Sequence, residues 1–349
     1  MGTSPTCCPL TQHTDLLDQV KLYPRLSIDS ARRVRQLAHN VLGQIAAKSG
    51  KRMVKHMSRI AGPWLAGAQD SDRAAARAAQ DALKQVFNTP EKLQNLGKAF
   101  QQPILEHCRD ALLNETVQTL SDERSVSSAD AQATYSRVVA TSIAVISNLL
   151  NDLASEDVAK QQETYESIIA QNKIWELASY KEDVVVRRSI HRFLRTCLTK
   201  QRTAIEANLS TISEAYISKA LPHDQTGSSY DFMLALVELT DALPQAWTTS
   251  YTSKKPASTR LRGCIKRGSQ AGPAEFWTNA WLLFSKLPTE VLPQKYSEAE
   301  ELLNAVHDGV GQKDDRFNAS AAWFAYFKIL DLVQDSASLS DEEHETLLS

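Results

Sequence analysis

Glycine is scarce in this chain: only 12 of its 349 residues are glycine, against a usual share of about 7%. Sheets with tight turns and dinucleotide-binding loops depend on glycine. The scarcity therefore favours a helical protein. The length gives a prior of about two domains, and a single extended array of helical repeats is the alternative at this size.

Long apolar runs are also lacking, as is the residue pattern of an N-terminal leader. No stretch approaches the roughly 18 consecutive apolar residues that a membrane-spanning helix needs. The segment from Met1 to Leu10 has neither a basic region nor an apolar core, so we expect no secretory signal peptide. We therefore expect a cytosolic protein that does not act at a membrane.

The cysteines form no recognisable framework. There are five, at positions 7, 8, 108, 197 and 264, and an odd number without close pairing argues against a disulfide scaffold. No Cys-x-x-Cys occurs, which excludes a zinc ribbon or a RING within this chain. Cys108 and Cys197 fall on the apolar faces of expected helices, where cysteine acts as a small buried hydrophobic residue.

Signatures of enzyme chemistry are absent as well. The chain has no Gly-x-Gly-x-x-Gly, Walker lysine loop, His-Glu-x-x-His or Gly-x-Ser-x-Gly motif, and none of its eight histidines lies at ligand spacing from another. We predict no catalytic residue, metal, cofactor or small-molecule ligand. His191 is interpreted as a partly exposed helix residue. The six tryptophans are assigned to the core, with stacking on nucleic-acid bases as the lesser alternative.

What the sequence does have is helical periodicity. The apolar positions of the clearest helix recur at i, i+4, i+7, i+8, i+11 and i+12, which places them on one face. They are Val186, Ile190, Phe193, Leu194, Cys197 and Leu198. The same spacing occurs over Tyr135–Leu153 and Ala319–Leu330, and no stretch alternates long enough for a strand. We predict an all-α fold.

The helices recur in pairs. Landmarks of the second helix fall near residues 187, 235, 281 and 323, which are 42 to 48 residues apart, and HEAT repeats have a period of about 40–47. A single helix pair cannot bury its apolar face, so we predict a HEAT-like solenoid of stacked antiparallel pairs over residues 21–333. Around it we expect a disordered segment 1–20, a polar connector near 121–132, a basic loop 252–273 and an acidic tail 334–349.

Positive charge is concentrated in two segments. Residues 21–62 contain ten basic residues and one acidic residue, Asp29, and residues 252–273 contain six basic residues and no acidic one. These segments carry +9 and +6 in a chain of net charge −2, which leaves −17 for the remainder. Such separation favours oriented docking onto a polyanion. An ordinary solvated surface is the alternative.

The basic residues are therefore the candidate site, because contacts with nucleic-acid phosphates are a common use of such clusters. The first set lies in the expected loop: Lys254, Lys255, Arg260, Arg262, Lys266 and Arg267. The second set lies in the first helices: Arg32, Arg33, Arg35, Lys51, Arg52 and Lys55.

Several stretches of the chain resemble the N-terminal region of the listerin family. They are Leu22-Tyr-Pro-Arg-Leu-Ser-Ile-Asp, Gly50-Lys-Arg-Met-Val-Lys-His-Met, Ile60-Ala-Gly-Pro-Trp-Leu, Asp72-Arg-Ala-Ala-Ala-Arg and Cys108-Arg-Asp-Ala-Leu-Leu. The similarity extends over about residues 22–332. The first twenty residues do not resemble the opening of the family.

The resemblance implies a function. Listerins are RING-type ubiquitin ligases of ribosome-associated quality control, which bind stalled large (60S) ribosomal subunits and ubiquitylate the nascent chain for degradation. Their N-terminal HEAT-like domain docks on the large subunit beside a second quality-control factor. The implied partners are ribosomal RNA, ribosomal proteins and quality-control factors, and we expect a monomer. The family's RING is at the far C-terminus, so we expect no ubiquitin transfer by this chain alone.

Two other functions stay open from the residues themselves. The first is a generic HEAT adaptor that binds a protein partner and has no role at the ribosome. The second is a helical enzyme, against which the lack of a convergent acid, base and nucleophile argues.

Overall fold

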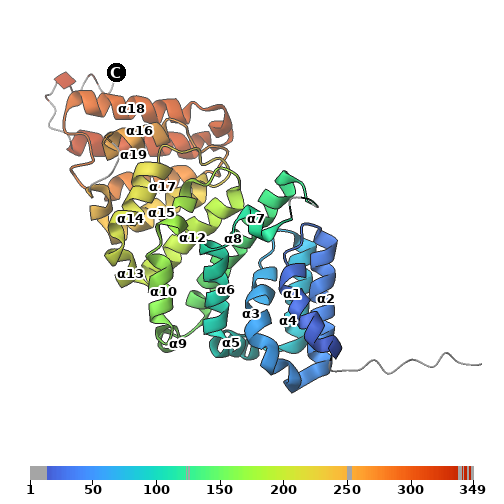
Figure 1. The fold of residues 1–349 in the computed structure, drawn as a ribbon. Helices are drawn as coiled ribbons and strands as arrows, with labels where there is room; N and C mark the ends of the chain where they lie inside the picture. Colours follow the sequence, from blue (N-terminus) through green and yellow to red (C-terminus); the bar gives the residue numbers. More distant parts are fainter. Residues whose placement is uncertain are drawn as a thin grey trace, which may run out of the picture. The chain divides into compact units, whose positions relative to one another are not determined.

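The structure, a computed structural model, describes residues 14–336 except 123, 125 and 250–253, together with 340, 342, 343 and 346. Within these residues, side chains are described from Val20 to Asp335 and at the four later positions. This part of the chain is helical and contains no strand (Figure 1), which confirms the all-α prediction. Within the segment 1–20 that we expected to be disordered, helix α1 already begins at Thr14. Residues 1–13 and most of the acidic tail lie outside the described part.

The chain divides into two compact units, the first ending at Tyr165 and the second beginning at Glu166. The first unit contains α1 (Thr14–Leu26), α2 (Arg32–Ser49), η1 (Gly50–His56), α3 (Met57–Gly67), α4 (Arg73–Val86), α5 (Pro90–Ala99), α6 (Gln101–Leu113), α7 (Val117–Leu120), α8 (Ser128–Asp152) and α9 (Ser155–Ala159). Helix α10 (Gln162–Ile169) contains the boundary. The expected connector is shorter than 121–132, because α8 begins at Ser128.

The second unit begins with α11 (Asn172–Trp175), η2 (Glu176–Ser179), α12 (Val184–Lys200), α13 (Arg202–Ala207), α14 (Leu209–Ser213) and the π-helical η3 (Glu214–Ala220). It continues with α15 (Ser229–Ala242), η4 (Pro244–Trp247), α16 (Ala257–Ile265), α17 (Glu275–Lys286), α18 (Tyr296–Val310), η5 (Lys313–Asn318) and α19 (Ala319–Ser336).

Helix α3 is the centre of the first unit and contacts α1, α4, α6 and α8. Its Trp64 is fully buried and donates a hydrogen bond from Nε1 to the Ala79 carbonyl on α4 (3.3 Å). Helix α4 begins where the Asp72 carboxylate accepts hydrogen bonds from two backbone amides of its first turn, the usual N-cap arrangement. Its alanine-rich face packs closely on α2, since a Cβ added at Gly43 would lie 2.6 Å from the Cβ of Ala82.

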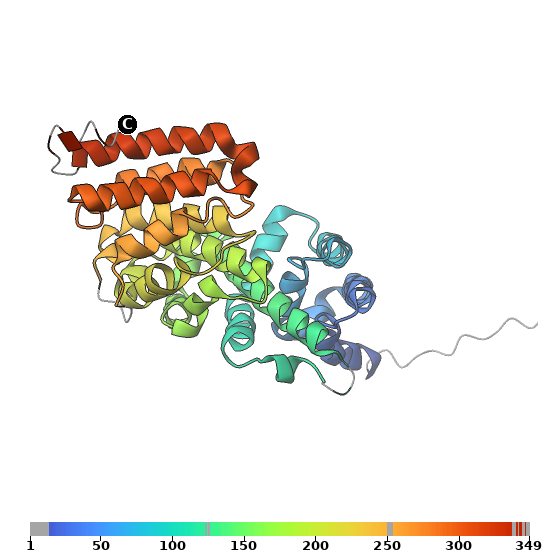
Figure 2. The same ribbon diagram turned by 90° about the horizontal axis from the view of Figure 1, so that it is seen from above.

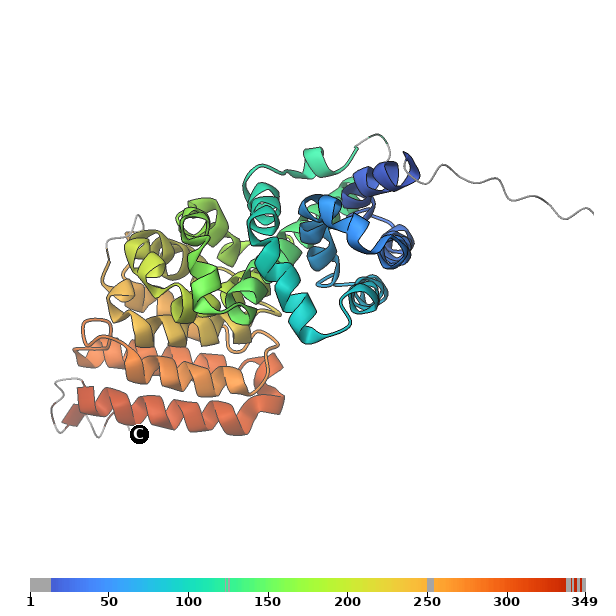
Figure 3. The ribbon, with the colours of Figure 1, turned by 90° about the horizontal axis from the view of Figure 1, so that it is seen from below.

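The second unit is an array of helix pairs in two layers. Helices α12, α15, α17 and α19 each contact the next, and α16 and α18 pack together in the other layer (Figures 2 and 3). The first-layer helices begin at Val184, Ser229, Glu275 and Ala319, 44 to 46 residues apart. This spacing agrees with the repeat period read from the sequence. The assignment of the pairs to the HEAT class in particular stays a prediction.

A buried polar ladder joins consecutive repeats of the second unit. Its three side chains, Gln225, Gln270 and Asp315, are 45 residues apart and precede α15, α17 and α19. The Gln225 amide donates to the Ala178 carbonyl (3.0 Å), and the Gln270 side-chain oxygen accepts from the Gln225 backbone N–H (2.7 Å). The Asp315 carboxylate in turn accepts from the Ser269 backbone N–H (2.8 Å). The side chain from each of these loops therefore forms a hydrogen bond with a backbone group of the preceding repeat.

Candidate basic binding surfaces

The basic segment 252–273 is not the long loop that we predicted. Residues Ala257–Ile265 form helix α16, and residues 252 and 253 lie outside the described part. The cause is an apolar stripe, Ala257, Leu261, Cys264 and Ile265, whose members are all buried. Its i, i+4, i+7, i+8 spacing is that of a packed helix face, and it was hidden in the sequence by the interspersed bases.

Two bases of this segment are held in ion pairs with α18. Arg262 Nη2 lies 2.7 Å from the Glu301 carboxylate, and Lys266 Nζ lies 2.9 Å from the Asp308 carboxylate. Both acids belong to the helix that packs against α16 in the same layer. These bases therefore join two neighbouring elements of the array.

Two more bases of the segment are turned inward. The Arg267 guanidinium donates hydrogen bonds to the carbonyls of Leu221 (2.6 Å) and His223 (3.0 Å). Arg260 is only 4% exposed, so its guanidinium cannot reach an external phosphate. Lys254 and Lys255, which precede α16, are also exposed, as is Lys266 despite its ion pair with Asp308.

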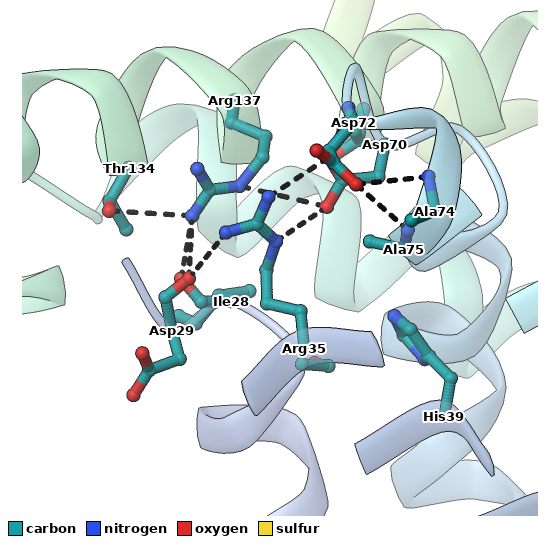
Figure 4. Close-up of polar contacts among 12 residues, drawn as sticks. Ile28, Asp29, Arg35, His39, Asp70, Asp72, Ala74, Ala75, Thr134 and Arg137 are labelled. Carbon is teal, nitrogen blue, oxygen red and sulfur yellow. Dashed lines mark hydrogen bonds and ion pairs between the residues drawn. The ribbon is translucent and has the colours of Figure 1, made fainter. Parts of the chain in front are cut away.

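The second predicted set is divided by the structure in the same way. Arg32 and Arg33 are exposed in the first turn of α2, but Arg35 is buried (3% exposed) and forms an ion pair with Asp70. Arg35 Nε lies 2.7 Å from Asp70 Oδ2, and Arg35 Nη1 donates to the Asp29 carbonyl (2.8 Å) (Figure 4). Arg35 therefore has a structural role, contrary to our prediction.

Arg137 of α8 completes this buried cluster. Its Nη2 donates to the carbonyls of Ile28 (2.8 Å) and Asp29 (3.1 Å), and its Nε lies 3.9 Å from Asp70 (Figure 4). Burial, followed by the nearby Arg35 charge, lowers the pKa of Arg137 to about 10. Two guanidiniums thus share one carboxylate and join α2 and α8 to the α1–α2 loop.

The remaining candidates form an exposed surface. Lys51, Arg52 and Lys55 lie on η1, and Arg59 follows on α3; all four are exposed. No ion pair joins any of them to an acid among the described residues, and no acidic residue occurs between Asp29 and Asp70. We call Lys51, Arg52, Lys55 and Arg59 the η1 basic cluster. Beside this cluster, the pKa of His56 is lowered, first by burial and second by the positive charge of Lys55.

The structure corrects our interpretation of His191. Its side chain is fully buried, with Nδ1 3.2 Å from the Tyr216 hydroxyl and Nε2 3.3 Å from Gln225 Oε1. Burial lowers the pKa of His191 to about 3. His191 lies on α12, which packs against η2 and α13 as well as α15. A residue beside the main apolar stripe of this helix is therefore buried too.

Most of the other core assignments are confirmed. Cys108 and Cys197 are buried, as are four of the tryptophans: Trp64, Trp175, Trp247 and Trp277. Trp323 differs, because it is 40% exposed on α19 beside Phe324 and Phe327. In the described part of the chain, no group of three or more His, Cys, Asp or Glu side chains could hold a metal ion. None of the helices described is long and apolar enough to cross a membrane.

Comparison with known proteins gives a consistent result. The family model for the N-terminal domain of the E3 ubiquitin-protein ligase listerin matches residues 13–287. The listerin of Neurospora crassa is 31% identical over 92% of this chain and 20% of its own length. The mouse listerin is 25% identical over 94% of this chain and 18% of its own. The chain thus spans about a fifth of the length of these relatives.

Solved structures add nothing to this result. An engineered protein of known crystal structure aligns over 92% of this chain with 14% identity and a TM-score of 0.30. A similarity at that level supports no argument about fold or function.

Proposed function

The chain belongs to the listerin family, and from this premise we propose that it is the ribosome-docking N-terminal module of a listerin-type ubiquitin ligase. In this proposal it binds large ribosomal subunits obstructed by a stalled nascent chain, in the cytosol, next to other quality-control factors. The chain contains no Cys-x-x-Cys, so it supplies binding. Ubiquitin transfer belongs to the RING that its family carries elsewhere.

The observation that carries the proposal is the η1 basic cluster. Its four bases are exposed and have no acidic partner among the residues described. In segment 252–273, by contrast, two bases form ion pairs with α18, one donates to backbone carbonyls and one is buried. Exposed bases without internal partners can release counterions from RNA phosphates on binding. We therefore place the main RNA contact on η1 and not in segment 252–273.

Sedimentation of the purified chain with large ribosomal subunits at several salt concentrations tests this. The variant Lys51→Ser/Arg52→Ser/Lys55→Ser should bind more weakly, and its plot of log affinity against log salt should be shallower by about two to three units. The matched control is Arg73→Ser/Arg77→Ser/Lys84→Ser on α4, which removes the same charge from exposed positions of the same unit.

The control variant should bind almost as the parent does. Equal weakening by both variants would indicate attraction through net charge alone, and unchanged binding by the first variant would remove η1 from the interface. Retained, salt-insensitive binding to a protein, with none to ribosomes, would favour the alternative of a HEAT adaptor.

A further inference from the structure

An apolar groove lies between α1 and α2 in the first unit. Its walls carry almost only aliphatic side chains, and its volume is about 240 Å³. The lining residues are Val20, Leu22, Tyr23, Leu26, Val34, Leu37, Ala38, Val41, Leu42 and Ile45. Small-molecule sites usually measure about 300–1,000 Å³ and contain several directed polar groups. This groove is smaller and lacks such groups, which suits apolar side chains of a protein partner.

The exposure of its walls is unusual for this unit. Leu22 is 56% exposed, and Leu37 and Val41 are nearly half exposed. The described part of the first unit has six large aliphatic side chains with such exposure, and four of them line this groove, the fourth being Leu26. Scattered exposed leucines are ordinary, but a contiguous apolar patch marks an interaction surface.

The charge around the groove restricts the partner. Arg33 lies one helical turn before Leu37, and Lys48 lies two turns after Val41, along the same line of α2; both are exposed. The nearest acidic residue that follows Arg33 in the sequence is Asp70, which is buried with Arg35. Helix α2 has no acidic residue of its own, so the α2 wall of the groove is flanked by positive charge, and a complementary ligand presents acidic residues to this wall. The acidic residues of helix α1, Asp15 and Asp18, belong to the first turns of that helix.

We propose that this groove binds an acidic amphipathic α-helix of a partner protein. The α2 wall extends from Val34 to Ile45, roughly 16 Å at about 1.5 Å per residue, which matches three turns of a bound helix. Such a helix places apolar anchors at i, i+4 and i+7 in the groove and glutamates or aspartates toward Arg33 and Lys48. This site is separate from the η1 basic cluster and does not depend on ribosome binding.

The test measures fluorescence anisotropy of a labelled 18-residue peptide of Leu, Glu and Ala, titrated with the full chain. Its leucines stand at i, i+4, i+7 and i+11. We expect saturable binding that weakens about tenfold or more in Leu37→Gln/Val41→Gln. Two matched peptides keep the composition with scrambled leucines or replace Glu with Lys, and both should bind at least about tenfold more weakly.

The control variant is Val54→Gln, which changes a slightly more exposed aliphatic side chain on η1, outside the groove. It should bind the peptide as the parent does, and circular dichroism should show that all variants remain folded. Three results would each overturn the proposal. They are equal binding of the scrambled peptide, equal binding by Leu37→Gln/Val41→Gln, and sedimentation showing a dimer of the chain that Leu37→Gln/Val41→Gln dissociates. Loss of ribosome binding would leave it unaffected.

Discussion

The imidazole of His39 occupies the space that a side chain at Gly67 would need. A Cβ added at Gly67 would lie 2.2 Å from Cε1 of His39. The same relationship recurs one and a half turns earlier on α3, where a Cβ at Gly62 would lie 2.7 Å from Cδ2 of His107. Helix α3 thus accommodates one histidine from α2 and one from α6 because it has glycine at both positions.

The substitution Gly67→Ala should therefore destabilise the first unit. Overpacking of this kind typically costs about 1–3 kcal/mol, and urea unfolding followed by circular dichroism measures it. The matched control is Gly263→Ala on α16, where a Cβ would meet nothing within 4 Å. Alanine there should be neutral or stabilise by up to about 1 kcal/mol. An unaltered midpoint for Gly67→Ala would mean that His39 can move aside without cost.

His39 should make stability depend on pH. Burial lowers its pKa to about 4, whereas an unfolded histidine titrates near 6.5. The folded protein thus holds His39 neutral, and its contribution is complete above about pH 6.5 and is lost as the pH falls toward 4. The loss should be about 1.4 kcal/mol per pH unit in this window. Urea unfolding between pH 7 and pH 5 should therefore show a difference of roughly 2 kcal/mol from this residue.

The comparison variant for this pH effect is His39→Gln, which cannot titrate. Its free energy of unfolding should fall less steeply with acidification than that of the parent, whatever its stability at pH 7. Parallel curves for the two proteins would show that His39 is not the group responsible.

Removing the charge of Asp70 should be among the most damaging changes. Asp70→Asn leaves the buried guanidinium of Arg35, and the less buried one of Arg137, without their shared carboxylate. Breaking a buried ion pair typically costs about 3–5 kcal/mol. The double variant Arg35→Met/Asp70→Leu should be more stable than Asp70→Asn, because no unpaired charge is left at Arg35. Thermal and urea unfolding of the three proteins would give this order, and a double variant less stable than Asp70→Asn would contradict it.

The polar ladder of the second unit gives a prediction with an adjacent control. Asp315→Ala removes the acceptor for the backbone N–H of Ser269 and for the indole N–H of Trp277 (2.7 Å). Leaving buried donors unsatisfied costs about 1–3 kcal/mol each. Asp314→Ala, at an exposed neighbouring position, should change the free energy of unfolding by less than about 0.5 kcal/mol. Similar effects of the two substitutions would show that the ladder contributes little to stability.

The regular helices could be predicted because their apolar stripes are long. The stripe from Val186 to Leu198 is the buried face of α12, and the repeat period follows from such stripes. Helix α16 was missed because its stripe has only four apolar positions, interrupted by Arg260 and Arg262. The helical spacing of these four residues is present in the sequence. The basic residues, glycines and prolines of the segment favoured a loop instead.

The candidate site was less predictable for a different reason. A cluster of basic residues is visible in a sequence. The acidic residues that pair with them are not, when they lie 35 or more residues away along the chain. Arg35 with Asp70 and Lys266 with Asp308 are such pairs. Only the folded arrangement separates bases with internal partners from those of the η1 basic cluster. The apolar groove was equally hidden, because exposed leucines have the same spacing as buried ones.

The buried cysteines make the two units separately observable. Cys108 lies in the first unit, and Cys197 and Cys264 lie in the second. Burial raises the pKa of all three thiols, that of Cys108 to about 12, so a thiol-modifying reagent can reach them only when the surrounding helices open. With Cys7 and Cys8 replaced by serine, labelling kinetics resolved by peptide mass would give an opening free energy for each unit. The chain thus contains its own reporters of whether one unit can unfold while the other stays intact.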